Sequence, residues 1–310
     1  MHKITVVVDC NDAGFAQAIC QSLAADTGIQ AVLPGHPAAV DARYACCWFP
    51  DPRLLTYCPS LRLIQAASAG VDHLPEALFE AGIPLCRIMD DGLRHGMLEY
   101  ALWGILYYQR HFDRVLANQP RQRWQRYPQR PAQAFRVGVM GLGETGGYIA
   151  WLLASLGYEV SGWARSMKQL DGVRCYAGDA QLPAFLGRLD ALINVLPLTD
   201  NTRGILAQRL FEQLPQGAVL INCGRGEHMN AAHVLAALES GQLAGAMLDV
   251  FPQEPLPQDD PLWRHPKVVI TPHMASAAPV AVITGQLLEN IQRCEAGLEP
   301  NYLVDKQKRY

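Results

Sequence analysis

Three residues in the last third of the chain are of the types that move protons and hold carboxylates. Arg225, Glu254 and His273 each follow a short apolar run. An arginine can hold a carboxylate through two parallel hydrogen bonds, and a histidine can exchange a proton near neutral pH. A carboxylate beside the histidine can fix its tautomer and stabilise the imidazolium. Each residue alone has an ordinary structural explanation, but together they predict a site for proton transfer to a substrate that carries a carboxylate.

The apolar runs before these residues are expected to be strands that deliver them to one place. In an open α/β sheet, ligands bind beyond the carboxyl ends of parallel strands. Helical patterns separate most of the runs, which predicts an α/β fold with parallel sheets covered on both faces. We expect strands at 4–8, 45–49, 63–66, 159–163, 191–195, 218–222, 244–248 and 268–271, and helices near 13–25, 96–108, 148–156 and 279–295.

A glycine-rich turn is the strongest single motif. Gly141, Gly143 and Gly146 follow an apolar run and precede a helical pattern, which is the setting of a dinucleotide-binding fingerprint. The first glycine allows the tight turn, the second lets a pyrophosphate approach the backbone, and the third lets the helix pack on the strand. The helix amino terminus then offers N–H groups to the phosphates. The alternative is a glycine turn without a ligand.

The position of this motif predicts two domains. It lies mid-chain, and roughly the first hundred residues have an α/β pattern of their own. We therefore expect two Rossmann-like domains with parallel sheets and a catalytic cleft between them, where ligand sites are common. Residues 1–98, completed by 280–310, are predicted to form the substrate domain. Residues 99–279 are predicted to form the dinucleotide-binding domain.

Composition narrows the class of protein. The 310 residues are 50% hydrophobic with a net charge of −3, which allows a large core and gives no basic stripe for nucleic acid. No apolar run approaches the length of a membrane span. The nine cysteines are odd in number and lack metal-ligand spacing, so we expect reduced thiols, a cytoplasmic location and no metal site.

The residues after the second strand of the fingerprint domain address the choice of cofactor. An NAD enzyme usually places an acid there, on the ribose hydroxyl. No acid occurs between Glu159 and Asp171, whereas Arg165, Ser166 and Lys168 are suited to a 2′-phosphate. NADP(H) is therefore the predicted preference, with NAD(H) possible. The alternative is that these are solvated turn residues.

The sequence resembles the D-isomer-specific 2-hydroxyacid dehydrogenase family over nearly its whole length. The resemblance is carried by Gly141-Leu-Gly-Glu-Thr-Gly146, Leu196-Pro-Leu-Thr199 with Thr202, Asn222-Cys-Gly-Arg-Gly226, Leu248-Asp-Val-Phe251 with Glu254-Pro255, and Thr271-Pro-His273. Finer features resemble its glyoxylate/hydroxypyruvate reductase A branch: Glu99-Tyr100, Gly245-Ala-Met-Leu-Asp-Val-Phe251, Pro255-Leu-Pro257, Pro261-Leu-Trp-Arg-His-Pro266 and the terminal Arg309-Tyr310.

The resemblance implies a reduction of small 2-keto acids, such as glyoxylate and hydroxypyruvate, by hydride from a nicotinamide. Arg225 would bind the carboxylate, His273 would donate the proton, and Glu254 would raise the pKa of His273. The implied substrate contacts also include the backbone of Ala69, Gly70 and Val71. The implied cofactor contacts are Gly141, Gly143, Glu144, Thr145, Gly146, Arg165, Ser166, Lys168, Leu196, Pro197, Thr202, Cys223 and Asp249.

Glu144 departs from the family pattern because its carboxylate lies close to the expected phosphates, so we expect its side chain to point outward. The long helix from Gly96 and the arginine-rich loop around Trp124 exceed what one core needs, and relatives use this region as a dimer arm, which predicts a homodimer. Two other functions stay open. One is a dehydrogenase for another D-2-hydroxy acid, and the other is a nucleotide-sensing binding protein of the same fold.

Overall fold

The computed structural model describes residues 3–26 and 28–305, so the terminal Arg309-Tyr310 pair lies outside the described residues. The chain divides into two compact units, which are described separately below. Unit 1 comprises Met1–Leu93 and Ala277–Tyr310, and unit 2 comprises Arg94–Ser276.

Unit 1 contains a five-stranded parallel sheet in the order β2-β1-β3-β4-β5. Helices α1 and α10 cover one face, where Ile19, Leu23, Ile283 and Leu287 pack together. Helices α2 and α3 cover the other face. The strands are β1 (Ile4–Cys10), β2 (Ile29–Val32), β3 (Tyr44–Trp48), β4 (Leu63–Ala66) and β5 (Leu85–Cys86), and the helices are α1 (Ala13–Leu23), α2 (Leu54–Tyr57), α3 (Glu76–Glu80) and α10 (Val280–Glu295).

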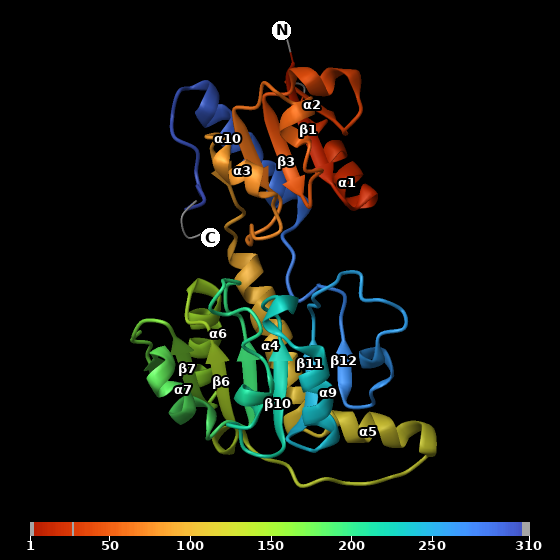
Figure 1. Cartoon of the computed structure of the whole chain (residues 1–310), viewed down its shortest axis with the longest axis vertical. Coiled ribbons are helices and arrows are strands. Elements are labelled where there is room, and N and C mark those ends of the chain that lie inside the picture. The colour runs from red at the N-terminus through yellow and green to blue at the C-terminus, as the bar shows by residue number, and fades with distance from the viewer. Residues whose placement is uncertain (1–2, 27, 306–310) are drawn as a thin grey trace. The chain divides into compact units, whose positions relative to one another are not determined.

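Unit 2 contains a seven-stranded parallel sheet in the order β12-β11-β10-β9-β6-β7-β8, and the strand arrows point toward one edge (Figure 1). Because strand order reverses direction next to β6, the glycine turn after β6 lies at a topological switch point, where α/β sheets bind ligands. The strands are β6 (Arg136–Met140), β7 (Glu159–Ala164), β8 (Val173–Ala177), β9 (Ala191–Asn194), β10 (Ala218–Asn222), β11 (Leu243–Leu248) and β12 (Val268–Ile270).

Helices bury both faces of this second sheet. The side chains of α4 and α6 pack on one face, and those of α7, α8 and α9 pack on the other. Apolar side chains on both faces explain why the strands read as continuous apolar runs rather than as alternating patterns. Helix α4 begins in unit 1, and its residues from Arg94 onward belong to unit 2. The helices are α4 (Asp91–Gln109), α5 (Phe112–Asn118), α6 (Glu144–Ser155), α7 (Gly178–Leu186), α8 (Gln208–Phe211) and α9 (Ala231–Glu239).

The predicted α/β class with two parallel sheets is confirmed, and the predicted strands occur within about two residues of their expected ends. Two helices begin earlier than predicted. Helix α4 starts at Asp91 and α6 at Glu144, directly after its N-cap residue Gly143. Both first turns contain glycines, which weaken a helical pattern in sequence. Strands β2, β5 and β8 were not predicted, because they are short or lie at a sheet edge. In the described part of the chain, no helix is long and apolar enough to span a membrane.

Candidate active site

Three adjacent strands of unit 2 deliver the three residues that the sequence singled out. Strands β10, β11 and β12 pair in parallel register, so their carboxyl ends lie at the same edge of the sheet. Arg225 lies three residues after β10, Glu254 six residues after β11, and His273 three residues after β12. The loops after these strands therefore begin side by side.

His273 and Glu254 form a direct pair. The Nδ1 atom of His273 lies 2.7 Å from Oε2 of Glu254, and the two side chains are 37% and 29% exposed. This hydrogen bond raises the pKa of His273, against the opposing effects of partial burial and of Arg225. Burial raises the pKa of Glu254, but hydrogen bonds from His273 and from the Phe251 N–H outweigh it, so that pKa is lowered overall. Both shifts favour a charged pair.

The geometry of the pair leaves one ring nitrogen for chemistry. Because Nδ1 of His273 is engaged by Glu254, its Nε2 atom is the one left for a substrate. The other oxygen of Glu254, Oε1, accepts a hydrogen bond from the Phe251 N–H at 2.9 Å. The carboxylate is therefore held at both oxygens, which fixes the direction in which the imidazole points.

The backbone at His273 is in the left-handed region, with a φ of 52°. This conformation is unusual for a residue with a side chain and costs about 1–3 kcal/mol. Asp249, which is fully buried, holds the loop in place. One of its carboxylate oxygens accepts from Thr271 Oγ1 and the Met274 N–H, and the other accepts from the Ala275 N–H, at 2.6–2.9 Å.

A buried polar network positions Arg225. The backbone N–H of Arg225 donates to Nδ1 of His228 at 3.1 Å, and one guanidinium nitrogen of Arg225 donates to the Gly224 carbonyl at 2.8 Å. The amide nitrogen of Asn194 lies 2.9 Å from Oδ1 of Asn222 and 3.0 Å from the same His228 nitrogen. Since Nδ1 of His228 accepts these bonds, its Nε2 carries the proton and faces the Pro197 carbonyl.

Asn194, Asn222 and His228 are all fully buried, and the sequence analysis did not identify them as part of the site. Asn222 had a weak signal, because it ends a predicted strand directly before the Gly224-Arg225 turn. No such signal existed for His228, because a histidine three residues after an arginine is as compatible with an exposed turn as with a buried turn.

The glycine turn has the shape that a dinucleotide requires. Gly141 has a φ of 101°, and a Cβ on it would lie 2.9 Å from the Val195 carbonyl oxygen. A Cβ on Gly146 would lie only 1.7 Å from the Gly141 oxygen, so the helix can pack on the turn only without a side chain. A Cβ on Gly143 would meet nothing within 4 Å. The open space is therefore beside the N-cap residue of α6, where a pyrophosphate would meet the helix N–H groups.

The remaining predicted cofactor residues lie around the same edge. Glu144 is exposed at the first turn of α6 and Thr145 is half-buried beside it. Arg165, Ser166 and Lys168 follow β7 directly and are exposed. Thr202 Oγ1 donates to the Pro197 carbonyl at 2.8 Å and thereby closes the loop after β9, while Leu196 and Cys223 are buried at the ends of their strands. The residues at this edge thus fit a nicotinamide dinucleotide. The cationic side chains of Arg165 and Lys168 and the hydroxyl of Ser166 fit its 2′-phosphate.

The loop whose backbone is an implied substrate contact lies in unit 1, directly after β4. Ala69 and Gly70 are half-buried and Val71 is buried. Ser68 Oγ donates to the Gly70 carbonyl at 2.8 Å, which folds the loop back on itself.

Comparison with known proteins agrees with this geometry. Residues 102–275 match the family described as D-isomer specific 2-hydroxyacid dehydrogenase, NAD binding domain. The chain is 41% identical over 299 residues to glyoxylate/hydroxypyruvate reductase A of Serratia proteamaculans, a match that covers 94% of this chain and 93% of that one.

Two solved structures are similar over almost their full lengths. A D-isomer specific 2-hydroxyacid dehydrogenase family protein from Klebsiella pneumoniae superimposes with a TM-score of 0.96 at 68% identity, covering 99% of each chain. An NADPH-dependent glyoxylate/hydroxypyruvate reductase from Sinorhizobium meliloti, in complex with NADP and sulfate, gives a TM-score of 0.88 at 34% identity. That match covers 99% of this chain and 100% of the other.

Proposed function

The chain belongs to the D-isomer specific 2-hydroxyacid dehydrogenase family, and we propose that it reduces glyoxylate and hydroxypyruvate with NADPH. The observation that carries the proposal is the His273–Glu254 pair at 2.7 Å, formed between the loops that follow β12 and β11. Strand β11 is next to β10, which precedes the loop of Arg225. An acid–base histidine and a carboxylate-binding arginine are the two groups that reduction of a 2-keto acid requires. The names of the relatives support the choice of substrates.

In the proposed mechanism, His273 is the general acid. Its Nε2 atom donates a proton to the keto oxygen as negative charge develops there, and it takes the proton back in the reverse direction. Glu254 stabilises the protonated imidazole through Nδ1 and so raises the pKa of His273. NADPH supplies the hydride when it is bound.

Arg225 is proposed to hold the substrate. Its planar guanidinium matches a carboxylate next to a carbonyl and can polarise both. The buried His228 and Asn194 fix the backbone from which it extends. The backbone amides of Ala69, Gly70 and Val71, in unit 1, are proposed to bind a substrate carboxylate.

Unit 2 is proposed to hold the cofactor. Gly141, Gly143 and Gly146 would receive the pyrophosphate, and Arg165, Ser166 and Lys168 the 2′-phosphate. Glu144, Thr145, Leu196, Pro197, Thr202 and Cys223 would line the remaining contacts. Asp249 is assigned differently. Because it is fully buried and both of its oxygens are engaged by the loop of His273, we propose that it positions His273 rather than contacting the cofactor.

We also propose a homodimer in the cytoplasm. Helix α5 and the loop after it expose large apolar side chains: Phe112, Val115, Leu116 and Trp124, the last at 93%. A cluster of exposed apolar side chains is unfavourable in water, which favours its burial against a second copy of this chain. All nine cysteines are free thiols, which supports a reducing compartment.

The test is consumption of NADPH with a panel of 2-keto acids that includes glyoxylate, hydroxypyruvate, pyruvate and phenylpyruvate. The proposal predicts the highest kcat/KM for the two smallest polar substrates. A preference for a bulkier keto acid would assign another D-2-hydroxy acid, and binding of NADPH without turnover of any member would favour the nucleotide sensor.

A further inference from the structure

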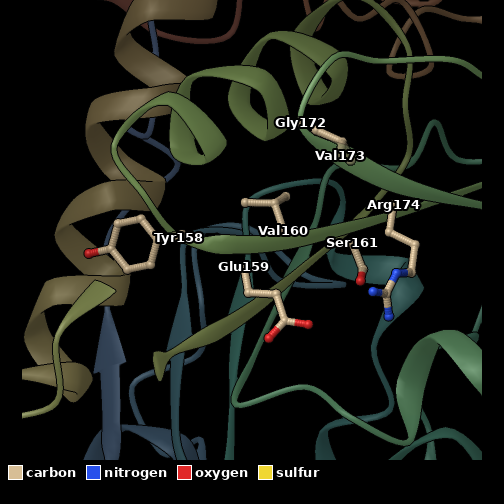
Figure 2. A pocket seen from close by; sticks show the side chains of 7 residues that line it. All are labelled: Tyr158, Glu159, Val160, Ser161, Gly172, Val173 and Arg174. Atoms are coloured by element: carbon tan, nitrogen blue, oxygen red, sulfur yellow. The ribbon is translucent and has the colours of Figure 1, made fainter. Parts of the chain in front are cut away.

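A polar pocket lies at the edge of the unit 2 sheet opposite to the catalytic residues. It has a volume of about 290 Å³ and is formed where β7 and β8 begin (Figure 2). The residues that line it are Tyr158, Glu159, Val160, Ser161, Gly172, Val173 and Arg174. Arg225, Glu254 and His273 follow the carboxyl ends of strands in the same sheet, so the pocket is separate from the candidate active site.

Ser161 supplies a hydroxyl group to this pocket. The residue as a whole is only 4% exposed, and the part that remains accessible lines the pocket. Figure 2 shows the hydroxyl on the same side of the sheet as the Glu159 and Arg174 side chains. The parallel register pairs Ser161 with Arg174, which places their side chains next to each other on one face.

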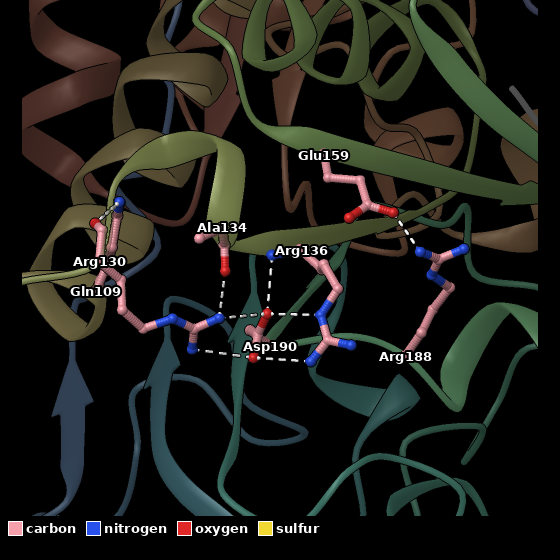
Figure 3. A network of polar contacts seen from close by, with 7 residues as sticks. All are labelled: Gln109, Arg130, Ala134, Arg136, Glu159, Arg188 and Asp190. Carbon is pink, nitrogen blue, oxygen red and sulfur yellow. Dashed lines mark hydrogen bonds and ion pairs between the residues drawn. The ribbon is translucent and has the colours of Figure 1, made fainter.

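Two opposite charges flank this hydroxyl without contacting each other. Glu159 forms an ion pair with Arg188, which comes from beyond the end of α7 (Figure 3). The pair uses only Oε1 of Glu159. Arg174 is exposed and has no ion-pair or hydrogen-bond partner for its guanidinium in the described part of the chain. The pocket therefore presents an acceptor oxygen on one side and a free guanidinium on the other.

Neighbouring charges add a positive field. Asp190 accepts hydrogen bonds from both Arg130 and Arg136, at 2.9–3.2 Å (Figure 3). Arg136 is also the register neighbour of Glu159 on the adjacent strand. Four arginines near this edge (Arg130, Arg136, Arg174 and Arg188) outnumber the three acids (Glu159, Asp171 and Asp190), so a ligand with an anionic group is favoured, and Glu159 adds a place for one cationic group.

We propose that this pocket binds a small α-amino acid as a zwitterion. The carboxylate would be held by the Arg174 guanidinium and the Ser161 hydroxyl, and the ammonium group would donate to Glu159. The small volume favours a short side chain such as that of glycine or serine. These are the amino acids formed by transamination of glyoxylate and hydroxypyruvate, but the site rests on its own charges and not on the proposed function.

The test is calorimetric titration of the full-length protein with glycine and with L-serine. Two probes separate the parts of the zwitterion: 3-hydroxypropionate lacks the ammonium group, and ethanolamine lacks the carboxylate. We expect saturable binding of the amino acids, at least ten-fold weaker binding of either probe, and a loss of about ten-fold or more in Arg174→Gln. Ser161→Ala should weaken binding to a smaller extent.

Two further variants locate the binding. Arg209→Gln removes an exposed arginine of the same unit on α8 and should leave binding unchanged. Arg225→Gln should also retain it, because the candidate active site is not involved. Absence of saturable binding, equal binding of 3-hydroxypropionate, or unchanged binding in Arg174→Gln would each overturn the proposal. Keto-acid turnover of Arg174→Gln is measured alongside and should equal the wild type, so failure of this site is distinct from failure of the proposed reaction.

Discussion

Replacing Glu254 by glutamine tests how the site keeps its acid charged. Reduction needs a proton on His273, so kcat/KM should fall as pH rises through the pKa of that residue. The hydrogen bond to Glu254 raises this pKa, and the active form therefore persists to higher pH than free histidine would allow. Glu254→Gln keeps the size and an acceptor oxygen but removes the charge. The alkaline fall in kcat/KM should then begin at lower pH, while the plateau at acid pH is retained.

The size of the effect follows from the exposure of the pair. Two charges about 4 Å apart attract by roughly 1 kcal/mol in water and roughly 4 kcal/mol in a medium of intermediate polarity. The side chains are 37% and 29% exposed, so solvent screening places the pair toward the lower value. Burial and Arg225 also oppose the charged imidazole. We therefore expect kcat/KM on the alkaline limb to fall about ten-fold, which corresponds to roughly 1.4 kcal/mol.

The assay is the pH dependence of kcat/KM for glyoxylate at saturating NADPH. Glu239→Gln, which makes the same change at an exposed position at the end of α9, is the matched control and should follow the wild type. His273→Ala should lose on the order of 10²–10⁴ in turnover at every pH. An alkaline limb that does not move in Glu254→Gln would refute the coupling and leave Glu254 as a loop residue that only binds the Phe251 N–H.

Three other predictions concern substrate, cofactor and assembly. Arg225→Lys should raise KM for the keto acid and lower kcat with nearly unchanged NADPH affinity, because an ammonium cannot copy the guanidinium fork; lost NADPH binding with normal turnover would place Arg225 in the cofactor site. Arg165→Asp should shift the ratio of kcat/KM toward NADH, and equal use of both cofactors by the wild type would contradict the role of Arg165. Light scattering at micromolar concentration should give the mass of a dimer, and Trp124→Ala should weaken the association; a monomeric wild type would exclude the dimer.

The order of elements could be predicted because parallel sheets impose simple rules on sequence. Buried strands such as Leu63–Ala66 and Ala218–Asn222 are mostly apolar, and their predicted bounds match the structure. Strand β8 escaped prediction because it lies at the sheet edge, where only half-buried or exposed residues are found and the apolar signal is weak. The functional residues near strand ends could also be predicted, since Arg225 and His273 each lie three residues after a strand.

What the sequence does not contain is the direction in which each side chain leaves its loop. The family resemblance implies that Asp249 contacts the cofactor, and its position after a strand at the ligand-binding edge gives no reason to assign it otherwise. Only the folded loop shows its carboxylate turned inward, accepting from Thr271 Oγ1 and two backbone N–H groups. These bonds offset the cost of the left-handed backbone at His273. We propose that this buried carboxylate aims the acid–base residue, and loop geometry of this kind depends on contacts between strands far apart in the sequence.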